Sequence, residues 1–140
     1  MSQEKVEIVR RNTDAYNRGD LDGTLNTWAP DAVLDWSRSR GFDAGVFRGH
    51  DAIRSHWQRL LESFDEVRIE LVDPIEVEDG LLIVENVGYL RGRDGIEVQT
   101  RSAWLITIRD GEVTSFTLYQ TKQDALETLG LSEQDAHADS

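Results

Sequence analysis

Three Asp-Gly pairs divide the second half of the chain into long β-type segments. The pairs are Asp79-Gly80, Asp94-Gly95 and Asp110-Gly111. Asp-Gly is a leading signal for tight hairpin turns, because glycine adopts positive φ without steric cost. The segments that follow these turns run over 81–91, 96–109 and 113–121. The pattern predicts consecutive antiparallel strands joined as a meander.

A further strand is expected before the first of these turns. From Glu66 onward apolar residues alternate with polar ones, which is the period of a half-buried strand. Pro74 interrupts this alternation, and proline cannot donate a ladder hydrogen bond. We therefore expect a bend, a bulge or a sheet edge at this position.

The first half of the chain is predicted to be mainly helical, because its apolar residues recur at helical spacing. Gly19 and Pro30 are the expected helix ends, and Asp20 is the expected N-cap of a second helix. A short helix closed by Gly130 follows the meander. The predicted elements are helices over 3–18, 21–28, 50–64 and 123–129 and strands over 32–34 and 46–48.

This order of elements predicts an α+β fold in which helices lie over one face of a curved antiparallel sheet. Such an arrangement encloses a cavity, where small-molecule sites tend to be built. The length of 140 residues predicts one domain, assigned to 1–131, and the polar segment 132–140 is expected to be a disordered tail.

Composition excludes several classes of function. The chain has no cysteine, which excludes disulfides and thiolate chemistry and fits a reducing, cytoplasmic location. The N-terminus lacks a signal-peptide core, and no apolar run approaches the ~18 residues of a membrane span. The formal net charge of −12 disfavours nucleic acids and anionic membranes as partners.

Several strings resemble the SnoaL-like branch of the nuclear transport factor 2-like superfamily. They are "YNRGDLDGTLNTWAPDAVLD", "FRGHDAIRSHW" and "RDGEVTSFTLYQTKQDALETLGL", and the resemblance runs from about Val6 to Leu131. It implies a cone-shaped curved sheet with three helices from the N-terminal half packed over it, plus the short C-terminal helix. It also implies a homodimer, commonly formed through the outer face of the sheet.

The resemblance does not carry over the catalytic residues of the ketosteroid isomerase branch. The position of its oxyanion tyrosine falls on Asn12, and that of its general-base aspartate falls on Trp36. Its supporting tyrosines fall on Trp28 and Trp57, and its protonated aspartate falls near Trp104. An indole N–H can donate a hydrogen bond but cannot accept a proton. Isomerase chemistry through the family's usual residues is therefore not expected.

The polyketide cyclase branch usually has an acid/base aspartate near the end of the last strand. That region of this chain holds Gln120 and Thr121, and neither side chain can act as a general base. Asp124 is the nearest acid and is expected on the last helix. Cyclase chemistry through the family's usual aspartate is therefore not expected either.

Asp35 is the first candidate proton acceptor. An aspartate in an apolar wall would have a raised pKa suited to acid/base work. The alternative is a structural salt bridge, for example with Arg101. Strand alternation puts Trp36 and Arg38 on the face opposite to Asp35, and the isomerase pattern favours Trp36 and Arg38 as the inward pair.

His56 is the second candidate, because a histidine can titrate near neutral pH. The alternative is a histidine with a purely structural role. His50 is expected at a helix start and His137 in the tail. Three scattered histidines predict no metal site, and the absence of a glycine-rich phosphate loop predicts no nucleotide cofactor.

Two hypotheses of function stay open. In the first, the pocket binds a small hydrophobic or polycyclic molecule and performs cofactor-independent isomerisation, cyclisation, dehydration or epoxide opening. Asp35 or His56 would then be catalytic. In the second, the domain binds a ligand or assembles without catalysis. The predicted substrate-binding side chains are Trp36, Arg38, Trp57, Trp104, Tyr119 and Gln120.

Overall fold

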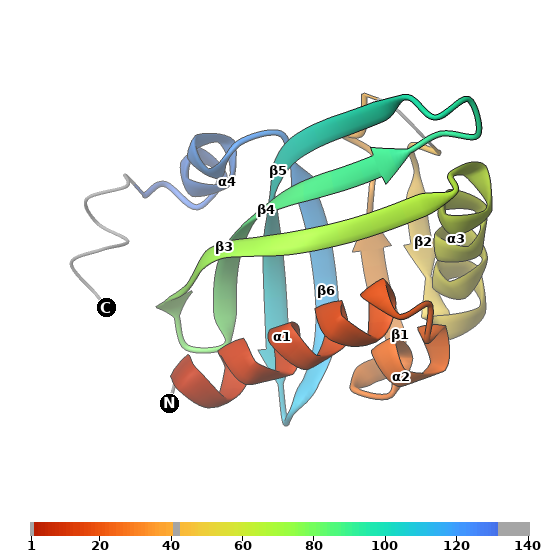
Figure 1. Ribbon diagram of the computed structural model, residues 1–140. Helices are drawn as coiled ribbons and strands as arrows, with labels where there is room; N and C mark the ends of the chain where they lie inside the picture. The colour runs from red at the N-terminus through yellow and green to blue at the C-terminus, as the bar shows by residue number, and fades with distance from the viewer. Residues whose placement is uncertain (1, 41–42, 132–140) are drawn as a thin grey trace.

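The structure is a computed structural model that describes residues 2–40 and 43–131. It confirms the predicted α+β class: the three helices of the N-terminal half lie over one face of a strongly curved six-stranded sheet (Figure 1). The predicted tail, 132–140, lies outside the described residues. The helices are α1 (Ser2–Asn17), α2 (Leu21–Leu25), α3 (Gly49–Ser63) and α4 (Lys122–Thr128). The strands are β1 (Trp28–Asp35), β2 (Val46–Arg48), β3 (Glu66–Glu78), β4 (Leu81–Arg91), β5 (Glu97–Arg109) and β6 (Glu112–Tyr119).

The predicted meander is present, and its strands lie in the sheet order β2-β1-β6-β5-β4-β3. The Asp-Gly pairs form its turns: Gly80 has φ +78° and Gly95 has φ +84°, while Asp110 and Gly111 have φ +52° and +78°. The middle turn is longer than expected, because the Gly92 N–H donates to the Ile96 carbonyl at 2.9 Å and β5 begins only at Glu97.

The sheet is mixed rather than wholly antiparallel. β1 pairs with β6 in parallel, whereas all other neighbours are antiparallel. Turn signals in a sequence set the direction only of strands that share a hairpin. β1 and β6 are far apart in the chain, so nothing in the turn chemistry specified their relative direction.

The prediction around Pro30 is wrong. α2 ends at Leu25, and Trp28 and Pro30 lie in β1 instead of in the helix. The pairing of β1 with β6 shifts in register between Trp28 and Val33, which accommodates a proline that cannot donate to the ladder. The analogous prediction for Pro74 is confirmed, since the β3–β4 register shifts between Val72 and Ile75.

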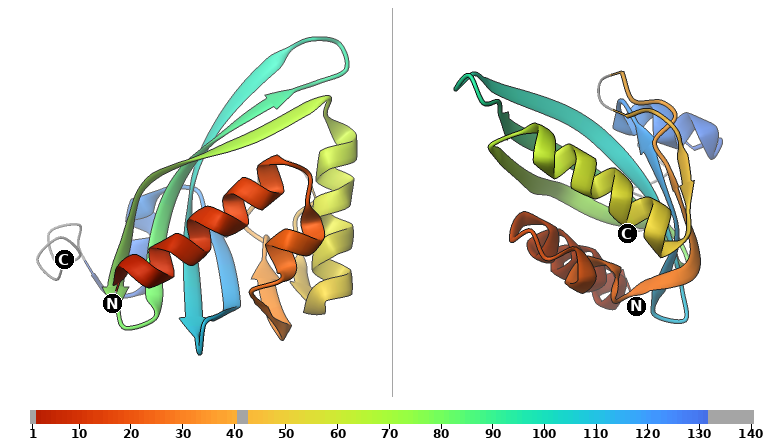
Figure 2. Two further views of the ribbon diagram at one scale, coloured as in Figure 1. Left: turned by 60° about the horizontal axis from the view of Figure 1, so that its bottom comes forward. Right: turned by 90° about the vertical axis from the view of Figure 1, so that its right-hand side faces the viewer.

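The helices divide between the two faces of the sheet. α1 crosses the concave face diagonally and α3 stands against β1 and β2, while α4 packs on the opposite side (Figures 1 and 2). A larger core fills the concave side, and a smaller one lies under α4, where Ala125 and Leu126 meet Ile75 and Ile83. None of the described helices is both long and apolar enough to cross a lipid bilayer.

Candidate ligand-binding cavity

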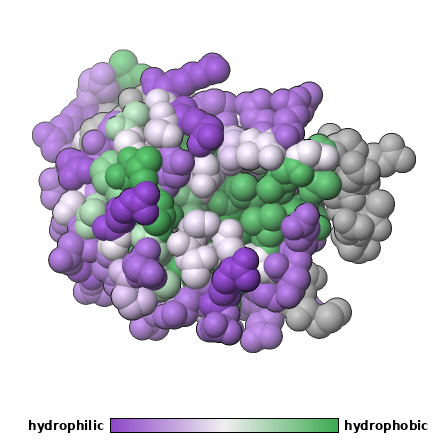
Figure 3. Space-filling view, turned by 180° about the vertical axis from the view of Figure 1, so that it is seen from behind, coloured by the Kyte–Doolittle hydropathy of each residue, from purple (hydrophilic) through white to green (hydrophobic). Residues whose placement is uncertain are grey.

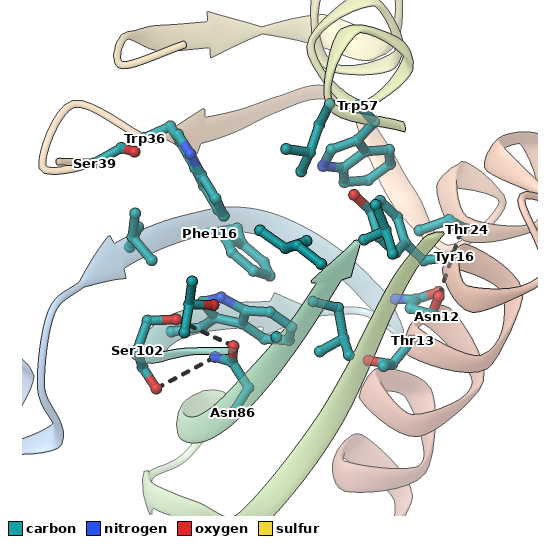
Figure 4. A pocket seen from close by; sticks show the side chains of 18 of the residues that line it. Asn12, Thr13, Tyr16, Thr24, Trp36, Ser39, Trp57, Asn86, Ser102 and Phe116 are labelled. Carbon is teal, nitrogen blue, oxygen red and sulfur yellow. Dashed lines mark hydrogen bonds between the residues drawn. The ribbon is translucent and has the colours of Figure 1, made fainter. Parts of the chain in front are cut away.

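A cavity of about 410 Å³ lies between α1, α3 and the concave face of the sheet (Figure 4). Its walls are mainly apolar and aromatic. The aromatic lining consists of Tyr16, Trp28, Trp36, Trp57, Phe64, Trp104 and Phe116. A volume of this size fits within the range usual for small-molecule sites.

The aromatic side chains pack against one another around this space and do not fill it. Trp28 meets Trp57 edge-on at 5.1 Å between ring centroids and stacks on Phe116 at 5.6 Å. Phe116 also contacts Trp104 at 4.8 Å, and Tyr16 meets Trp57 at 5.8 Å. These mutual contacts hold the rings in place, so the cavity has rigid aromatic walls.

Two hydrogen-bonding side chains reach the cavity from α1. Asn12 and Tyr16 are one helical turn apart and therefore share a face of the helix. Thr27 Oγ1 donates to Asn12 Oδ1 at 2.8 Å. The amide nitrogen of Asn12 points toward the cavity (Figure 4). Burial raises the pKa of Tyr16, so its hydroxyl stays protonated and can donate. These two groups suit a carbonyl or hydroxyl oxygen of a ligand.

A second polar spot lies on the sheet. Asn86 and Ser102 face each other across β4 and β5. Ser102 Oγ donates to Asn86 Oδ1 at 3.1 Å, and Asn86 Nδ2 donates to the Ser102 carbonyl at 3.4 Å (Figure 4). Asn86 is only 4% exposed. Asn86 was not predicted as a site residue, although a polar residue at an inward position of an apolar strand is a signal for such a site.

The cavity wall itself holds neither a carboxylate nor an imidazole among the described lining residues. Its charged residues are Arg40 and Arg101. Arg101 pairs with Val87 in the β4–β5 ladder, one position away from the inward Ser102. Alternation therefore directs the Arg101 side chain to the convex face. The wall can bind and orient a guest, but it offers no general base.

The predicted substrate-binding residues separate into two groups. Trp36, Trp57, Trp104 and Gln120 line the cavity. Arg38 and Tyr119 instead line a shallow groove outside it, which Gln120 also reaches. β1 ends at Asp35, so strand alternation does not continue to Arg38.

Asp35 lies outside the cavity lining. Its Oδ1 accepts hydrogen bonds from Ser37 N at 3.0 Å and Ser37 Oγ at 2.6 Å, and Arg38 Nη1 lies 3.6 Å from its Oδ2. Partial burial raises the pKa of Asp35, but these hydrogen bonds and the positive charge of Arg38 outweigh it and hold the pKa below its ordinary value. The expected partner Arg101 is replaced by Arg38, and the carboxylate is held ionised in a local turn.

His56 is fully buried and is paired with Asp43, which was not among the predicted site residues. Its Nδ1 lies 2.8 Å from Asp43 Oδ2, and Asp43 also accepts hydrogen bonds from Arg59. Burial lowers the pKa of His56, and the negative charge of Asp43 only partly opposes this shift. Asp43 is in the β1–β2 loop with φ +56°, a conformation that its sequence context gave no reason to expect.

The described residues contain no cluster of three or more histidine, cysteine or acidic side chains arranged to hold a metal ion. The prediction concerning metals and cofactors stays a prediction.

Comparison with solved structures shows the fold. The chain has a TM-score of 0.74 and 16% identity with TerC, co-crystallised with polyporic acid, and covers 98% of that chain and 91% of its own length. The TM-score is 0.72 at 13% identity with RV0760c of Mycobacterium tuberculosis, in complex with estradiol-17beta-hemisuccinate, with 85% of this chain and 95% of that chain covered. A Catenulispora acidiphila protein of ketosteroid isomerase-like fold, in complex with trimethylamine, gives 0.71 at 18% identity, covering 90% and 94%.

Comparison of sequences shows the family. The uncharacterized protein Rv0034 of Mycobacterium tuberculosis is 30% identical over 126 residues, which are 89% of this chain and 94% of that protein. The uncharacterized protein Mb0035 of Mycobacterium bovis matches with the same identity and coverage. The model of the SnoaL-like domain matches residues 9–116. The chain therefore belongs to the family of SnoaL-like domains.

Proposed function

We propose that this protein binds a small, flat, hydrophobic molecule in the cavity between α1, α3 and the sheet. The observation that carries this proposal is the cavity of about 410 Å³ with aromatic walls and no carboxylate or imidazole among its described lining residues. Removing a flat apolar molecule from water favours binding in proportion to the apolar area buried. The rings of Trp57, Trp104 and Phe116 provide surfaces for such contacts.

The polar groups define what else the guest should carry. Tyr16 and Asn12 can donate to an oxygen at the α1 end, while Asn86 and Ser102 form a second polar spot on the sheet. A molecule with oxygen substituents on a flat ring system would match both positions. The oxygen-bearing compounds crystallised with TerC and RV0760c support this choice of ligand class.

A substitution at the edge of the cavity tests the proposal. Thr100 lines the cavity and faces Gly88 across the strands, so Thr100→Trp would place an indole into the space above a residue without a side chain. Gln99→Trp adds the same group one residue away on the opposite face and is the matched control. Small molecules that co-purify with the protein would be identified by mass spectrometry of denatured samples.

We expect the same small molecule to co-purify with wild type and Gln99→Trp but not with Thr100→Trp. If none co-purifies, flat aromatic probes should quench the tryptophan fluorescence of wild type and Gln99→Trp but not that of Thr100→Trp. Equal binding by all three proteins would contradict the proposed location. If no flat aromatic probe binds to the wild type, the proposed ligand class is contradicted.

A catalytic version of this function is cofactor-independent isomerisation, cyclisation, dehydration or epoxide opening on the bound molecule. The observation that favours it is the buried His56 with its Asp43 partner close to the cavity. Catalysis would require contact between this imidazole and the bound molecule, and His56 is not among the residues that line the cavity.

We also infer a homodimer in a cytoplasmic setting, as the family resemblance implies. Hydrophobic residues form a band from the middle of the molecular face seen from behind toward its right-hand side, with hydrophilic residues above and below, and a second copy would cover this band (Figure 3). Light scattering on a size-exclusion column measures the mass in solution. A mass of one chain, about 15.9 kDa, would contradict the dimer.

A further inference from the structure

One ring nitrogen of His56 is strongly paired, and the other has no hydrogen-bond partner among the described residues. The side chain is 0% exposed, and Nδ1 lies 2.8 Å from Asp43 Oδ2. Asp43 is held ionised, because the hydrogen bond from His56, opposed in part by burial, and the contacts with Arg59 lower its pKa. An ionised carboxylate can only accept, so Nδ1 carries the proton and donates it. Nε2 must then present its lone pair.

That lone pair is buried without a hydrogen-bond donor among the described residues. Leaving a buried polar atom unpaired costs about 1–3 kcal/mol. A purely structural role does not need this atom, because the Asp43–Arg59 pair, 2.7 Å apart, already ties the β1–β2 loop to α3. Buried titratable groups that combine an oriented partner with an unsatisfied atom are typical of functional sites.

Two aromatic rings enclose the imidazole. Phe47 stacks on it at 4.4 Å and 25°, and Trp36 meets it at 5.3 Å and 61°. Trp36 also lines the cavity, where it faces Phe116 (Figure 4). The indole of Trp36 thus touches both the buried imidazole and the cavity, and it belongs to a residue just beyond the end of β1.

We propose that His56 and Asp43 form a proton-accepting dyad that the indole of Trp36 separates from the cavity and that becomes available when this indole turns aside. His56 is the catalytic residue, and Asp43 is a positioning residue that fixes the tautomer. The substrate class is a flat aromatic or carbonyl compound with an acidic C–H group. The proposal rests on the proposed function in that this substrate must occupy the same cavity.

The charges around the dyad set its pH range. The charged groups that the described structure places against His56 are Asp43 in the β1–β2 loop and Arg59 on α3. Burial keeps the imidazole neutral at pH 7, which is the form that accepts a proton. The carboxylate of Asp43 then stabilises the imidazolium that forms during the reaction.

The first test measures access to Nε2 and needs no cavity ligand. Diethyl pyrocarbonate acylates neutral imidazoles, and peptide mapping by mass spectrometry separates His56 from the other histidines. We expect slow modification of His56 in the wild type and faster modification in Trp36→Leu. Gln99→Trp alters only the convex face of the sheet and should leave the His56 rate unchanged. Trp36→Phe is the alternative if the leucine variant does not fold.

The second test measures proton transfer with 5-nitrobenzisoxazole as the probe. His56 Nε2 takes the proton from C3, the C–H electron pair forms the new π bond of the nitrile, and the N–O bond breaks. The electrons of that bond leave on oxygen, so the product is 2-cyano-4-nitrophenolate, which is followed by its absorbance. The imidazolium then returns its proton to solvent, and no oxidant or reductant is needed.

We expect Trp36→Leu to accelerate this elimination, and adding His56→Gln to lower the rate by a factor on the order of 10². In the Trp36→Leu background, Asp43→Asn should move the pH–rate midpoint downward, because the negative charge that favours the imidazolium is lost. An Asp43 that acted only through its ion pair with Arg59 would leave that midpoint in place.

Three outcomes would overturn the proposal. They are an unreactive His56 in folded Trp36→Leu, equal His56 reactivity in wild type and Trp36→Leu, and elimination that survives His56→Gln. Failure of the cavity proposal has a different signature. In that case His56 would still be acylated faster in Trp36→Leu, but the elimination would be as fast with Thr100→Trp as with Gln99→Trp.

Discussion

Replacing Gly80 by alanine should destabilise the protein much more than the same change at Gly95. Both glycines lie in Asp-Gly turns with nearly equal positive φ, +78° and +84°. A β-carbon at Gly80 would lie 2.6 Å from the Ile108 carbonyl oxygen, whereas nothing lies within 4 Å of one at Gly95. Comparing the two alanine variants therefore separates the cost of the steric contact from the cost of the positive φ.

The magnitudes follow from these two terms. A left-handed conformation costs an alanine roughly 1–2 kcal/mol, and this cost applies at both sites. The contact with Ile108 adds about 1–3 kcal/mol at Gly80, which is the usual cost of overpacking. The strands cannot separate easily there, because the Ile108 N–H donates to the Gly80 carbonyl at 2.7 Å. We expect a total loss of roughly 2–5 kcal/mol for Gly80→Ala and roughly 1–2 kcal/mol for Gly95→Ala.

Equilibrium unfolding in urea, followed by the fluorescence of the four tryptophans, measures both losses. The slope of the transition should be the same for wild type and both variants, so that the midpoints report stability directly. Equal midpoints for the two alanine variants would refute the steric argument. A Gly95→Val variant that unfolds at the wild-type midpoint would refute the turn assignment itself, because a β-branched residue resists positive φ.

Three further predictions concern the helices and the buried histidine. Trp57→Ala should lower the free energy of unfolding by about 3–5 kcal/mol, since Trp57 is 7% exposed, and a loss well under 1 kcal/mol would show that α3 packs through another face. Asp20→Ala should cost about 1 kcal/mol in urea unfolding, because Asp20 Oδ1 caps α2 by accepting from the Gly23 N–H at 2.9 Å, and an unchanged midpoint would count against the cap. The contribution of His56 to the free energy of unfolding should be fully present above pH 6.5 and should decline on acidification. The reason is that His56 becomes protonated at a higher pH in the unfolded chain than in the folded protein. The lowered pKa of Asp43 acts with the same sign at more acidic pH, and a His56→Gln variant with an equally steep decline between pH 6.5 and 5 would refute the assignment.

The fold was largely predictable because its determinants are local. The turns depend on neighbouring Asp and Gly residues, and the bulge near Pro74 depends on a missing N–H. The start of β1 was not predictable in this way. Trp28 follows the helical spacing of α2, but its place in the sheet depends on pairing with Val113 of β6. Tertiary pairing there overrides a local pattern.

The site was only partly predictable for a related reason. The tryptophans of the cavity were identifiable because large aromatic residues at inward positions either fill or line a concave sheet. Asp43 was not identifiable, because its role depends on a loop conformation with positive φ that brings it to His56. Arg38 was expected inside because alternation was continued past Asp35, where the strand ends.

The parallel pairing of β1 with β6 has a consequence for how the chain is made. β1 leaves the ribosome early, but its parallel partner β6 (Glu112–Tyr119) is among the last parts of the chain to be synthesised. Until then, the apolar faces of α1 and α3 have no completed wall to cover them. Nascent chains of this architecture should thus depend on chaperones that shield exposed apolar surface until translation is nearly finished.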